Sequence, residues 1–252
     1  MPPGTAVGDQ KFDEFVHDLH AICGDVRLLW LPKDSETTTS TDRSLNARVI
    51  TYDASVATRY IVQGSGLTVS FNGTANEADP PDVPALSFGN GAQDEPFSLV
   101  VLCKPDVTNV AQTLIAKEDS ATAEEWNLGL DANADLVLTL TDESATGTIT
   151  GTFTTSIGTD LILVSATYDG SRAASGIKLY TNGLARTTVL GGASYTAMEN
   201  TAALVHLGAR YTTKAQFFDG NLGLALVAAK MLNPDEEWAI KTLVNAFFDL
   251  AL

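Results

Sequence analysis

Apolar and polar residues alternate along most of the second half of the chain, in runs that end at tight-turn residues. One run, residues 161–168, leads into Asp169-Gly170, and a second, residues 176–181, leads into Asn182-Gly183 before another run over 184–190. Asn-Gly and Asp-Gly adopt the positive φ values that two-residue hairpin turns require. The pattern therefore predicts antiparallel hairpins and an all-β chain.

Strands with the same two-residue period follow one another from Phe97 to about Lys230. Two of these strands carry three leucines on one face: Leu136, Leu138 and Leu140 in the first, and Leu222, Leu224 and Leu226 in the second. We predict two antiparallel sheets packed as a sandwich. Residues 72–96 contain four prolines and predict a long irregular surface connection, and the polar tract 34–42 predicts a loop.

Helical spacing replaces the strand pattern near the start of the chain. Phe12, Phe15, Val16, Leu19 and Ile22 fall on one stripe, and a glycine follows as a stop signal. The first strand begins only after this helix. We therefore divide the chain into an N-terminal arm with an amphipathic helix, residues 1–25, and a sandwich domain, residues 26–252.

A second helix with clear start signals closes the sequence. Asn233 can act as the N-cap, Pro234 takes the first helical position, and Glu236 completes a capping box. The apolar side of this helix comprises Trp238, Ile240, Leu243, Val244, Phe247 and Phe248. The predicted architecture is a sandwich with a short helix at each end of the chain.

The net charge of the chain argues against some classes of binding partner. The 252 residues include 31 acidic and 15 basic residues, for a net charge of −16. Phosphate backbones attract clustered Lys and Arg, so we expect no nucleic-acid partner. The apolar runs are far shorter than the ~20 residues that span a bilayer, so we expect no membrane contact, and the first residues show no export signal.

Cys23 and Cys103 are too few for a disulfide framework, and Cys103 is predicted to be buried.

Seven motifs in order resemble strands of the laminin G-like, concanavalin A-like jelly-roll family. They are 96–106 (PFSLVVLCKPD), 114–119 (LIAKED), 126–131 (WNLGLD), 165–171 (SATYDGS), 177–183 (IKLYTNG), 207–210 (LGAR) and 218–220 (FDG). Residues 28–31 and 66–73 resemble its opening segments, and 232–237 its closing helix. The resemblance covers roughly residues 26–245 and implies a two-sheet antiparallel jelly-roll sandwich. It does not imply one function, because folds host many functions.

Two departures from that family limit what the resemblance implies. Residues 161–164 are Leu-Ile-Leu-Val where many relatives carry Trp and His, and residues 222–224 are Leu-Gly-Leu where relatives often carry an acidic pair. A metal or ligand role for those carboxylates is therefore not implied here.

Catalytic signals are weak. Jelly rolls support glycoside hydrolases, which need two facing carboxylates. Residues 77–82 contain three acids, but their prolines argue against a central strand, and the acidic pairs at 124–125 and 142–143 are predicted to be solvated turns. His17 and His20 share a helix face without a third metal ligand, and His206 is predicted to be a half-buried strand residue. We expect a protein that is not an enzyme.

Calcium is the one cofactor that the residues and the resemblance bring into consideration. Asp131, Asn133, Asp135, Asp169 and Asp219 lie in oxygen-rich loops, and the resemblance implies that some relatives bind the ion. Asp and Asn are also common in turns for their local hydrogen bonds. We favour turn chemistry and expect no bound metal or other cofactor.

Two functions fit this description. The first is a virion structural protein, as in bacteriophage jelly rolls of this kind: a capsid decoration or cement protein that docks on the major capsid protein and assembles in the host bacterial cytoplasm. The second is a carbohydrate-binding, lectin-like module for a surface glycan. Its aromatic candidates are Trp126, Tyr168, Tyr180, Tyr195 and Tyr211. We favour the first.

The terminal helices supply the predicted assembly surface. Phe12, Phe15, Val16 and Leu19, with Phe247 and Phe248, are expected to form an apolar interface for homo-oligomers or particle proteins. The alternative is that both helices fold back onto their own sandwich.

Overall fold

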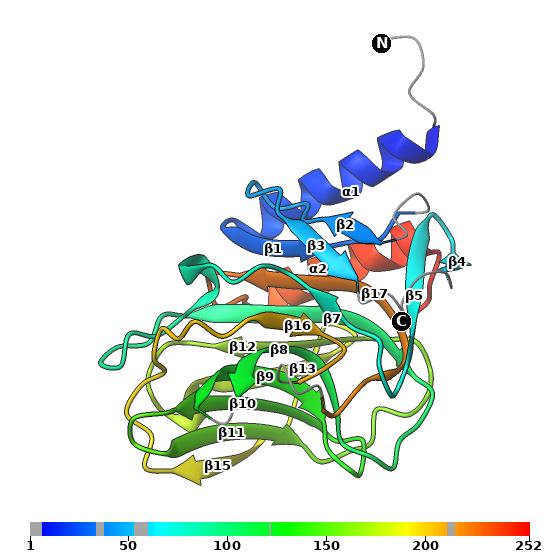
Figure 1. Ribbon diagram of the computed structural model, residues 1–252. Helices are drawn as coiled ribbons and strands as arrows, with labels where there is room; N and C mark the ends of the chain where they lie inside the picture. Colours follow the sequence, from blue (N-terminus) through cyan, green and yellow to red (C-terminus); the bar gives the residue numbers. More distant parts are fainter. Residues whose placement is uncertain (1–6, 34–37, 53–59, 121, 211–214) are drawn as a thin grey trace.

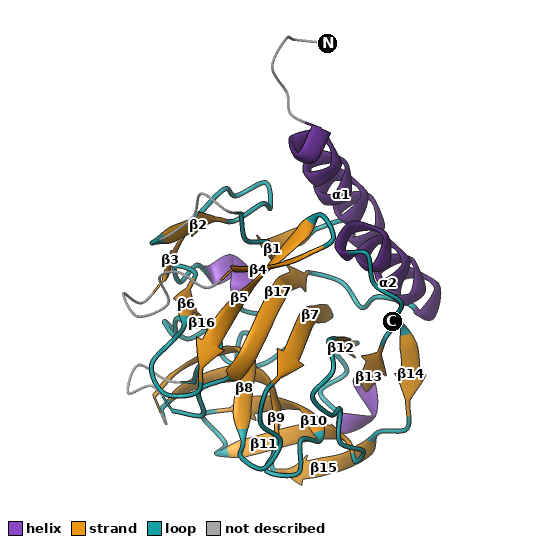
Figure 2. Cartoon of the chain, turned by 90° about the vertical axis from the view of Figure 1, so that its right-hand side faces the viewer, coloured by secondary structure: helices purple, strands orange, loops and turns teal. Residues whose placement is uncertain are grey.

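Two antiparallel β-sheets are stacked face to face, and two helices lie together on the outer side of one sheet (Figures 1 and 2). The computed structural model describes residues 7–33, 38–52, 60–120, 122–210 and 215–252. The helices are α1 (Val7–Cys23) and α2 (Pro234–Phe248), and short 3-10 turns are η1 (Pro84–Leu86) and η2 (Ala174–Gly176). The predicted all-β sandwich, with a helix near each end of the chain, is confirmed.

The first sheet, sheet A, contains eight strands within the described residues. Their spatial order is β14 (Leu184–Arg186), β13 (Ile177–Thr181), β12 (Ile162–Tyr168), β7 (Phe97–Pro105), β17 (Asp219–Ala228), β5 (Gly66–Asn72) and β4 (Tyr60–Gln63), and β1 (Val26–Trp30) also pairs with β17. All of these neighbours are antiparallel.

The second sheet, sheet B, contains nine strands within the same described ranges. Their order is β15 (Val189–Ala193), β11 (Gly147–Phe153), β10 (Leu136–Asp142), β9 (Ala123–Leu130), β8 (Gln112–Ser120), β16 (Val205–Leu207), β6 (Ala78–Asp79), β3 (Val49–Tyr52) and β2 (Thr39–Thr41). Strand β6 lies in the segment that was predicted to be irregular, and β2 lies in the tract that was predicted to be a loop.

Alternate residues of both sheets fill the space between them. Leu136, Leu138 and Leu140 all lie in this core, as their shared strand face predicted. The segment 72–96 also contributes, because Phe88 stacks on Phe97 with ring centroids 4.5 Å apart. The prediction of a purely superficial connection is therefore wrong at its apolar residues.

Sheet A is covered on its other face as well. Leu224 and Leu226 of β17 pack toward the helices, whereas Leu222 lies in the core between the sheets. The three leucines were predicted to share one face, but the strand register shifts between Leu222 and Leu224. Such a bulge inserts one residue and reverses the side-chain alternation beyond it.

The two helices close this outer layer by packing on each other. Phe15 of α1 stacks on Phe247 of α2 with ring centroids 4.2 Å apart. Phe248 continues inward to Gly66 of β5, where an added Cβ would lie 2.3 Å from its ring. A glycine at this position therefore makes the space that the Phe248 ring fills.

Local turn and cap signals are confirmed where their partners are close in sequence. Asn182 and Gly183 have φ values of 50° and 71° between β13 and β14, as a tight hairpin requires. The Asn233 side chain accepts hydrogen bonds from the backbone of Asp235 and Glu236 in a complete capping box. Residues 169–170 are different, because a longer connection containing η2 follows β12.

Buried and half-buried carboxylates anchor several loops, and the sequence did not indicate this. The half-buried Asp94 accepts hydrogen bonds from the hydroxyls of Tyr168 and Tyr195 at 2.7 and 2.6 Å, and these contacts join segments that are distant in the chain. Asp42, inside the tract predicted as a loop, is buried and pairs with Arg48 at 3.2 Å.

Replacing Phe15 with alanine is expected to lower the free energy of unfolding by about 3 kcal/mol, because it leaves a cavity beside the Phe247 ring. The matched control is Trp238→Ala on α2, whose side chain is 50% exposed and should cost less than about 1 kcal/mol. Denaturant unfolding measures both. Equal losses in the two variants would contradict the packing described for α1.

Glu237 of α2 is fully buried over sheet A. Its Oε2 accepts a hydrogen bond from Ser165 Oγ at 2.6 Å. Burial raises the pKa of Glu237 from 4.5 to about 7, an effect that this hydrogen bond only partly offsets. The folded protein therefore holds this proton more tightly than the unfolded chain does.

Glu237 should accordingly make stability fall as the pH rises from about 4.5 through about 7, since its contribution is fully present only below the unfolded pKa. Glu237→Gln should remove this dependence and be more stable than the wild type above pH 7 by up to about 3 kcal/mol. Denaturant titrations between pH 4 and 8 measure the difference. The exposed Glu95→Gln should follow the wild type, and parallel curves for the wild type and Glu237→Gln would refute the assignment.

Candidate functional site

A polar pocket of about 180 Å³ opens on the outer face of sheet B. Leu128 and Leu138 point into the core, so the alternating residues of β9 and β10 point outward. Asn127, Gly129, Val137 and Thr139 form the pocket floor, and Gln112, Asp131, Arg210 and Gln216 are among the residues around it. Strands thus supply the floor of the pocket, and the ends of connections supply its wall.

Arg210 lines the charged side of this pocket, and the buried Glu118 is its partner. Glu118 is buried and pairs with the Arg210 guanidinium, and it accepts a hydrogen bond from Asn127 Nδ2 at 3.1 Å. Arg210 also pairs with Glu124 Oε1 at 3.1 Å. Burial raises the pKa of Glu118 to about 7, although Arg210 acts in the opposite direction.

The pocket therefore presents several hydrogen-bonding groups. Thr139 offers a hydroxyl and Gln216 an amide, and Arg210 is flanked by two carboxylates that offset its charge. Small-molecule sites commonly combine such polar groups with apolar surface, which Val137 supplies here.

No pattern in the sequence indicates this pocket. Polar residues at alternate strand positions are the ordinary pattern of a solvated sheet face. Asn127 and Thr139 become neighbours only when β9 pairs with β10 and places Asn127 directly opposite Thr139. A strand-pairing register would have been needed to find them.

The six predicted assembly residues lie elsewhere, between the helices and sheet A. Phe12, Phe15, Leu19, Phe247 and Phe248 are buried, at 8% exposure or less, and Val16 packs against the same cluster. The prediction that the jelly roll would leave this face open is wrong, because the two helices cover each other. The alternative, in which both helices fold back onto their own sandwich, describes the structure.

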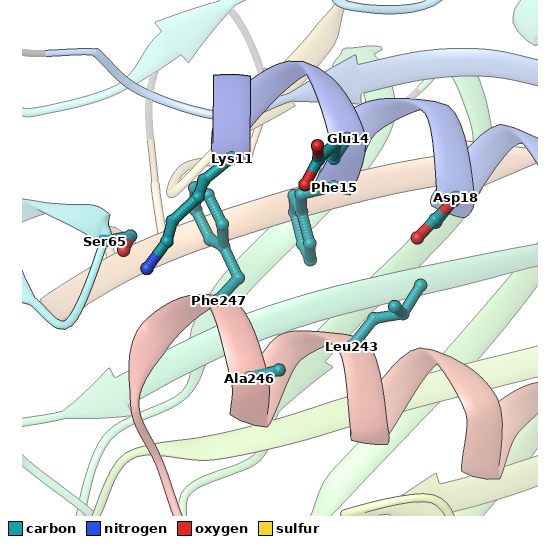
Figure 3. Close-up of a pocket in the computed structure, with 8 residues that line it drawn as sticks. All are labelled: Lys11, Glu14, Phe15, Asp18, Ser65, Leu243, Ala246 and Phe247. Atoms are coloured by element: carbon teal, nitrogen blue, oxygen red, sulfur yellow. The ribbon is translucent and has the colours of Figure 1, made fainter. Parts of the chain in front are cut away.

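A shallow groove remains along the line where α1 meets α2 (Figure 3). Its volume is about 220 Å³, and the rings of Phe15 and Phe247 line it together with Leu243. Lys11 and Asp18 lie at its rim, at opposite ends of the view. Most of the apolar residues of α1 are buried inside the molecule, and only the edge of this apolar face reaches the groove.

The acidic pairs that were predicted to be solvated are in fact largely buried. Glu125 is fully buried and accepts hydrogen bonds from Thr201 and Ser87, and its nearest cation is Lys117 at 3.4 Å. Asp142 is buried and accepts from the backbone of Ala145, Thr196 and Ala197, and these bonds hold its pKa below the ordinary value despite burial. Both carboxylates anchor loops. The prediction failed because their partners lie far away in sequence.

The oxygen-rich loops behave as turns. Asp131 Oδ1 accepts from the backbone of Asn133 and Asp135, and Asp169 Oδ1 accepts from that of Ser171. Asp219 is a strand residue of β17. These contacts are those of Asx turns.

The remaining candidate residues are dispersed. His17 is exposed, whereas His20 Nε2 lies 2.9 Å from the carbonyl of Arg43. Trp126, Tyr168 and Tyr180 are buried, as is Cys103. Tyr195 is half-buried and holds Asp94, and Tyr211 lies outside the described residues. In the described part of the chain, no helix is both long and apolar enough to cross a membrane.

Comparison with solved structures identifies the same fold in binding domains of larger proteins. The binding domain of Paraclostridial Mosquitocidal Protein 1 has a TM-score of 0.65 and 12% identity over 90% of this chain and 53% of that one. The botulinum neurotoxin serotype D ligand-binding domain, in complex with N-acetylneuraminic acid, has a TM-score of 0.60 and 13% identity over 89% and 52%. The chain thus spans about half the length of each.

A third similar structure matches over nearly its whole length. It is domain 4 of AbnA, a GH43 extracellular arabinanase from Geobacillus stearothermophilus, in complex with arabinotriose. The TM-score is 0.61 and the identity 15%, over 86% of this chain and 98% of that one. No family model and no curated protein matches the sequence. At these identities the similarity shows the β-sandwich fold alone.

Replacing Arg210 with methionine is expected to raise the pKa of Glu118 above about 7, because the guanidinium is the main group that favours the charged carboxylate. Carbon-13 NMR titration of the glutamate carboxyls measures this shift. Lys178→Met, which removes an exposed cation, serves as the control. An unchanged Glu118 titration in Arg210→Met would contradict the ion pair.

Proposed function

We propose that the chain is a carbohydrate-binding, lectin-like domain that holds a neutral oligosaccharide in the pocket on sheet B. The observation that carries the proposal is the pocket itself, a set of polar groups on the outer face of the sandwich. The fold similarity supports it, since two of the similar domains were solved with a sugar bound.

The donor and acceptor groups of the pocket suit sugar hydroxyls, each of which both donates and accepts a hydrogen bond. The Thr139 hydroxyl and the Gln216 amide offer both functions, and Val137 supplies apolar surface for the C–H groups of a sugar ring. Strands β9 and β10 fix the positions of the floor residues, which reduces the entropy lost on binding.

The charge balance favours a neutral ligand. Arg210 is paired with Glu118 and Glu124, so its positive charge is offset before any ligand arrives. The whole chain carries a net charge of −16, which repels acidic sugars at longer range. A neutral oligosaccharide needs no unpaired positive charge in the pocket and is not repelled by the net negative charge of the chain.

Binding without cleavage is part of the proposal. Glycoside hydrolysis needs a carboxylic acid and a second carboxylate that both reach the substrate. Glu118 is engaged by Arg210 and Asn127, and Asp131 holds its own turn. Neither group is arranged as an acid or a base over the pocket.

The virion role remains a prediction from the sequence. The three similar structures described above are two binding domains and a domain of an arabinanase, and none of them supports that role. The buried helix contacts also remove the exposed face on which the docking argument rested.

The test is a glycan array followed by calorimetry with the best neutral oligosaccharide, using arabinotriose as the first probe. Thr139→Val keeps the side-chain shape and removes one hydroxyl, so it should weaken binding by about fivefold to tenfold. Gln216→Ala should weaken binding as well.

The matched control is Thr242→Val on α2, far from sheet B, which should bind like the wild type. Sialylated glycans should bind less well than their neutral counterparts. Absence of binding across the array, or equal binding by Thr139→Val, Gln216→Ala and the wild type, would overturn the proposal.

A further inference from the structure

Three side chains with metal-ligating groups meet where β6 pairs with β16. Leu207 lies opposite Ala78 in this pairing, so the register places His206 beside Asp79. Glu77 precedes Asp79 by two positions and therefore lies on the same side of the sheet. Leu207 and Ala78 point into the core, so the three polar groups share the outer face of sheet B.

The geometry of the cluster is tight. His206 Nδ1 lies 2.8 Å from Asp79 Oδ1 and 3.6 Å from Glu77 Oε2. One ligand atom from each residue lies within 4.8 Å of the other two. His206 and Glu77 are buried, whereas Asp79 is 30% exposed and opens the cluster to solvent.

We propose that Glu77, Asp79 and His206 form a binding site for a divalent transition-metal ion of the zinc type. The cluster offers one imidazole nitrogen and two carboxylates, a mixed donor set that suits Zn²⁺ better than the all-oxygen set that Ca²⁺ prefers. This site is separate from the pocket and does not depend on the proposed sugar-binding function.

The spacing of the donors fits this ion. Zinc bonds to nitrogen and oxygen are about 2.0–2.2 Å long, so donors at tetrahedral corners lie about 3.4 Å apart. The separation between His206 Nδ1 and Glu77 Oε2 is already close to this value, at 3.6 Å. The hydrogen-bonded pair of His206 and Asp79 would have to open by about 0.6 Å, a small change for a half-buried carboxylate.

The charges of the two carboxylates and the chemistry of the His206 ring also suit a metal ion. Nδ1 would bind the metal through its lone pair, with the neutral ring carrying its one proton on Nε2, as histidine ligands are neutral when they coordinate. In the described structure His206 Nε2 has no hydrogen-bond partner, so the polar contacts of the ring all come from the side that faces the carboxylates. A divalent cation would balance two carboxylates, and water could take the fourth position through the exposed side of Asp79.

A bound ion would fasten the connection 72–96 to sheet B. Strand β6 is only two residues long, and it links β16 to β3. Three ligands from the two sides of the β6–β16 pairing would reinforce this short link. The metal would therefore have a structural role, and its loss should lower the melting temperature.

The test is isothermal calorimetry with ZnCl₂ on the chelator-treated full chain, with thermal unfolding as a second readout. One zinc per chain and a higher melting temperature are expected. Co²⁺ in place of zinc should give the visible absorption of a tetrahedral site. His206→Gln and the more conservative Asp79→Asn should each weaken zinc binding by about tenfold or more.

His17→Gln is the matched control, because it removes an exposed histidine that lies on α1 and should leave binding unchanged. Circular dichroism establishes that each variant is folded, and Asp79→Asn keeps the test valid if His206→Gln fails to fold. Absence of zinc binding in the wild type, equal binding by Asp79→Asn, or a response to Ca²⁺ instead of Zn²⁺ would each overturn the proposal.

Discussion

The architecture depends on sheet A being buried on both of its faces. Its central strands β7 and β17 send alternate residues to the inter-sheet core and to the layer beneath the helices. An antiparallel sheet often leaves one face to solvent, which gives alternating polar positions. Here both faces are apolar, so α1 and α2 are required as a third layer, and sheet B keeps the polar outer face that contains the pocket.

Buried and half-buried carboxylates hold several loops in position. Asp94 joins Tyr168 and Tyr195, and Asp142 holds the backbone of Thr196 and Ala197. A buried carboxylate is costly unless its oxygens are hydrogen-bonded, so each one favours a single loop arrangement. Carboxylates also position a residue in the wall of the pocket, because Glu118 and Glu124 orient Arg210.

Sequence patterns predicted the features whose causes are local. The turn at Asn182-Gly183 and the cap at Asn233 each depend on residues within a few positions, and both are confirmed. The prediction that three leucines share one face of β17 is wrong, because a bulge against the neighbouring strand β7 shifts the register. The apolar helix faces were recognised, but only the folded chain shows that each helix covers the other.

The candidate sites were harder to predict for the same reason. Asn127 and Thr139 are separated by 12 positions and meet only through the register of β9 and β10. Glu77 and Asp79 were dismissed because of nearby prolines, yet two residues suffice to form β6 beside His206. Sequence spacing describes one strand at a time, whereas these sites are made from pairs of strands.

The helix pair also determines how the molecule would respond to a pulling force. Phe15 lies by Phe247, while Asp18, farther along α1, lines the groove near Leu243, earlier in α2, so the helices run in opposite directions (Figure 3). The last turn of α2 therefore lies next to the middle of α1, at Phe12 and Phe15. Tension applied through the two ends of the chain would separate the helices one contact at a time, like a zipper, before it loaded the sheets.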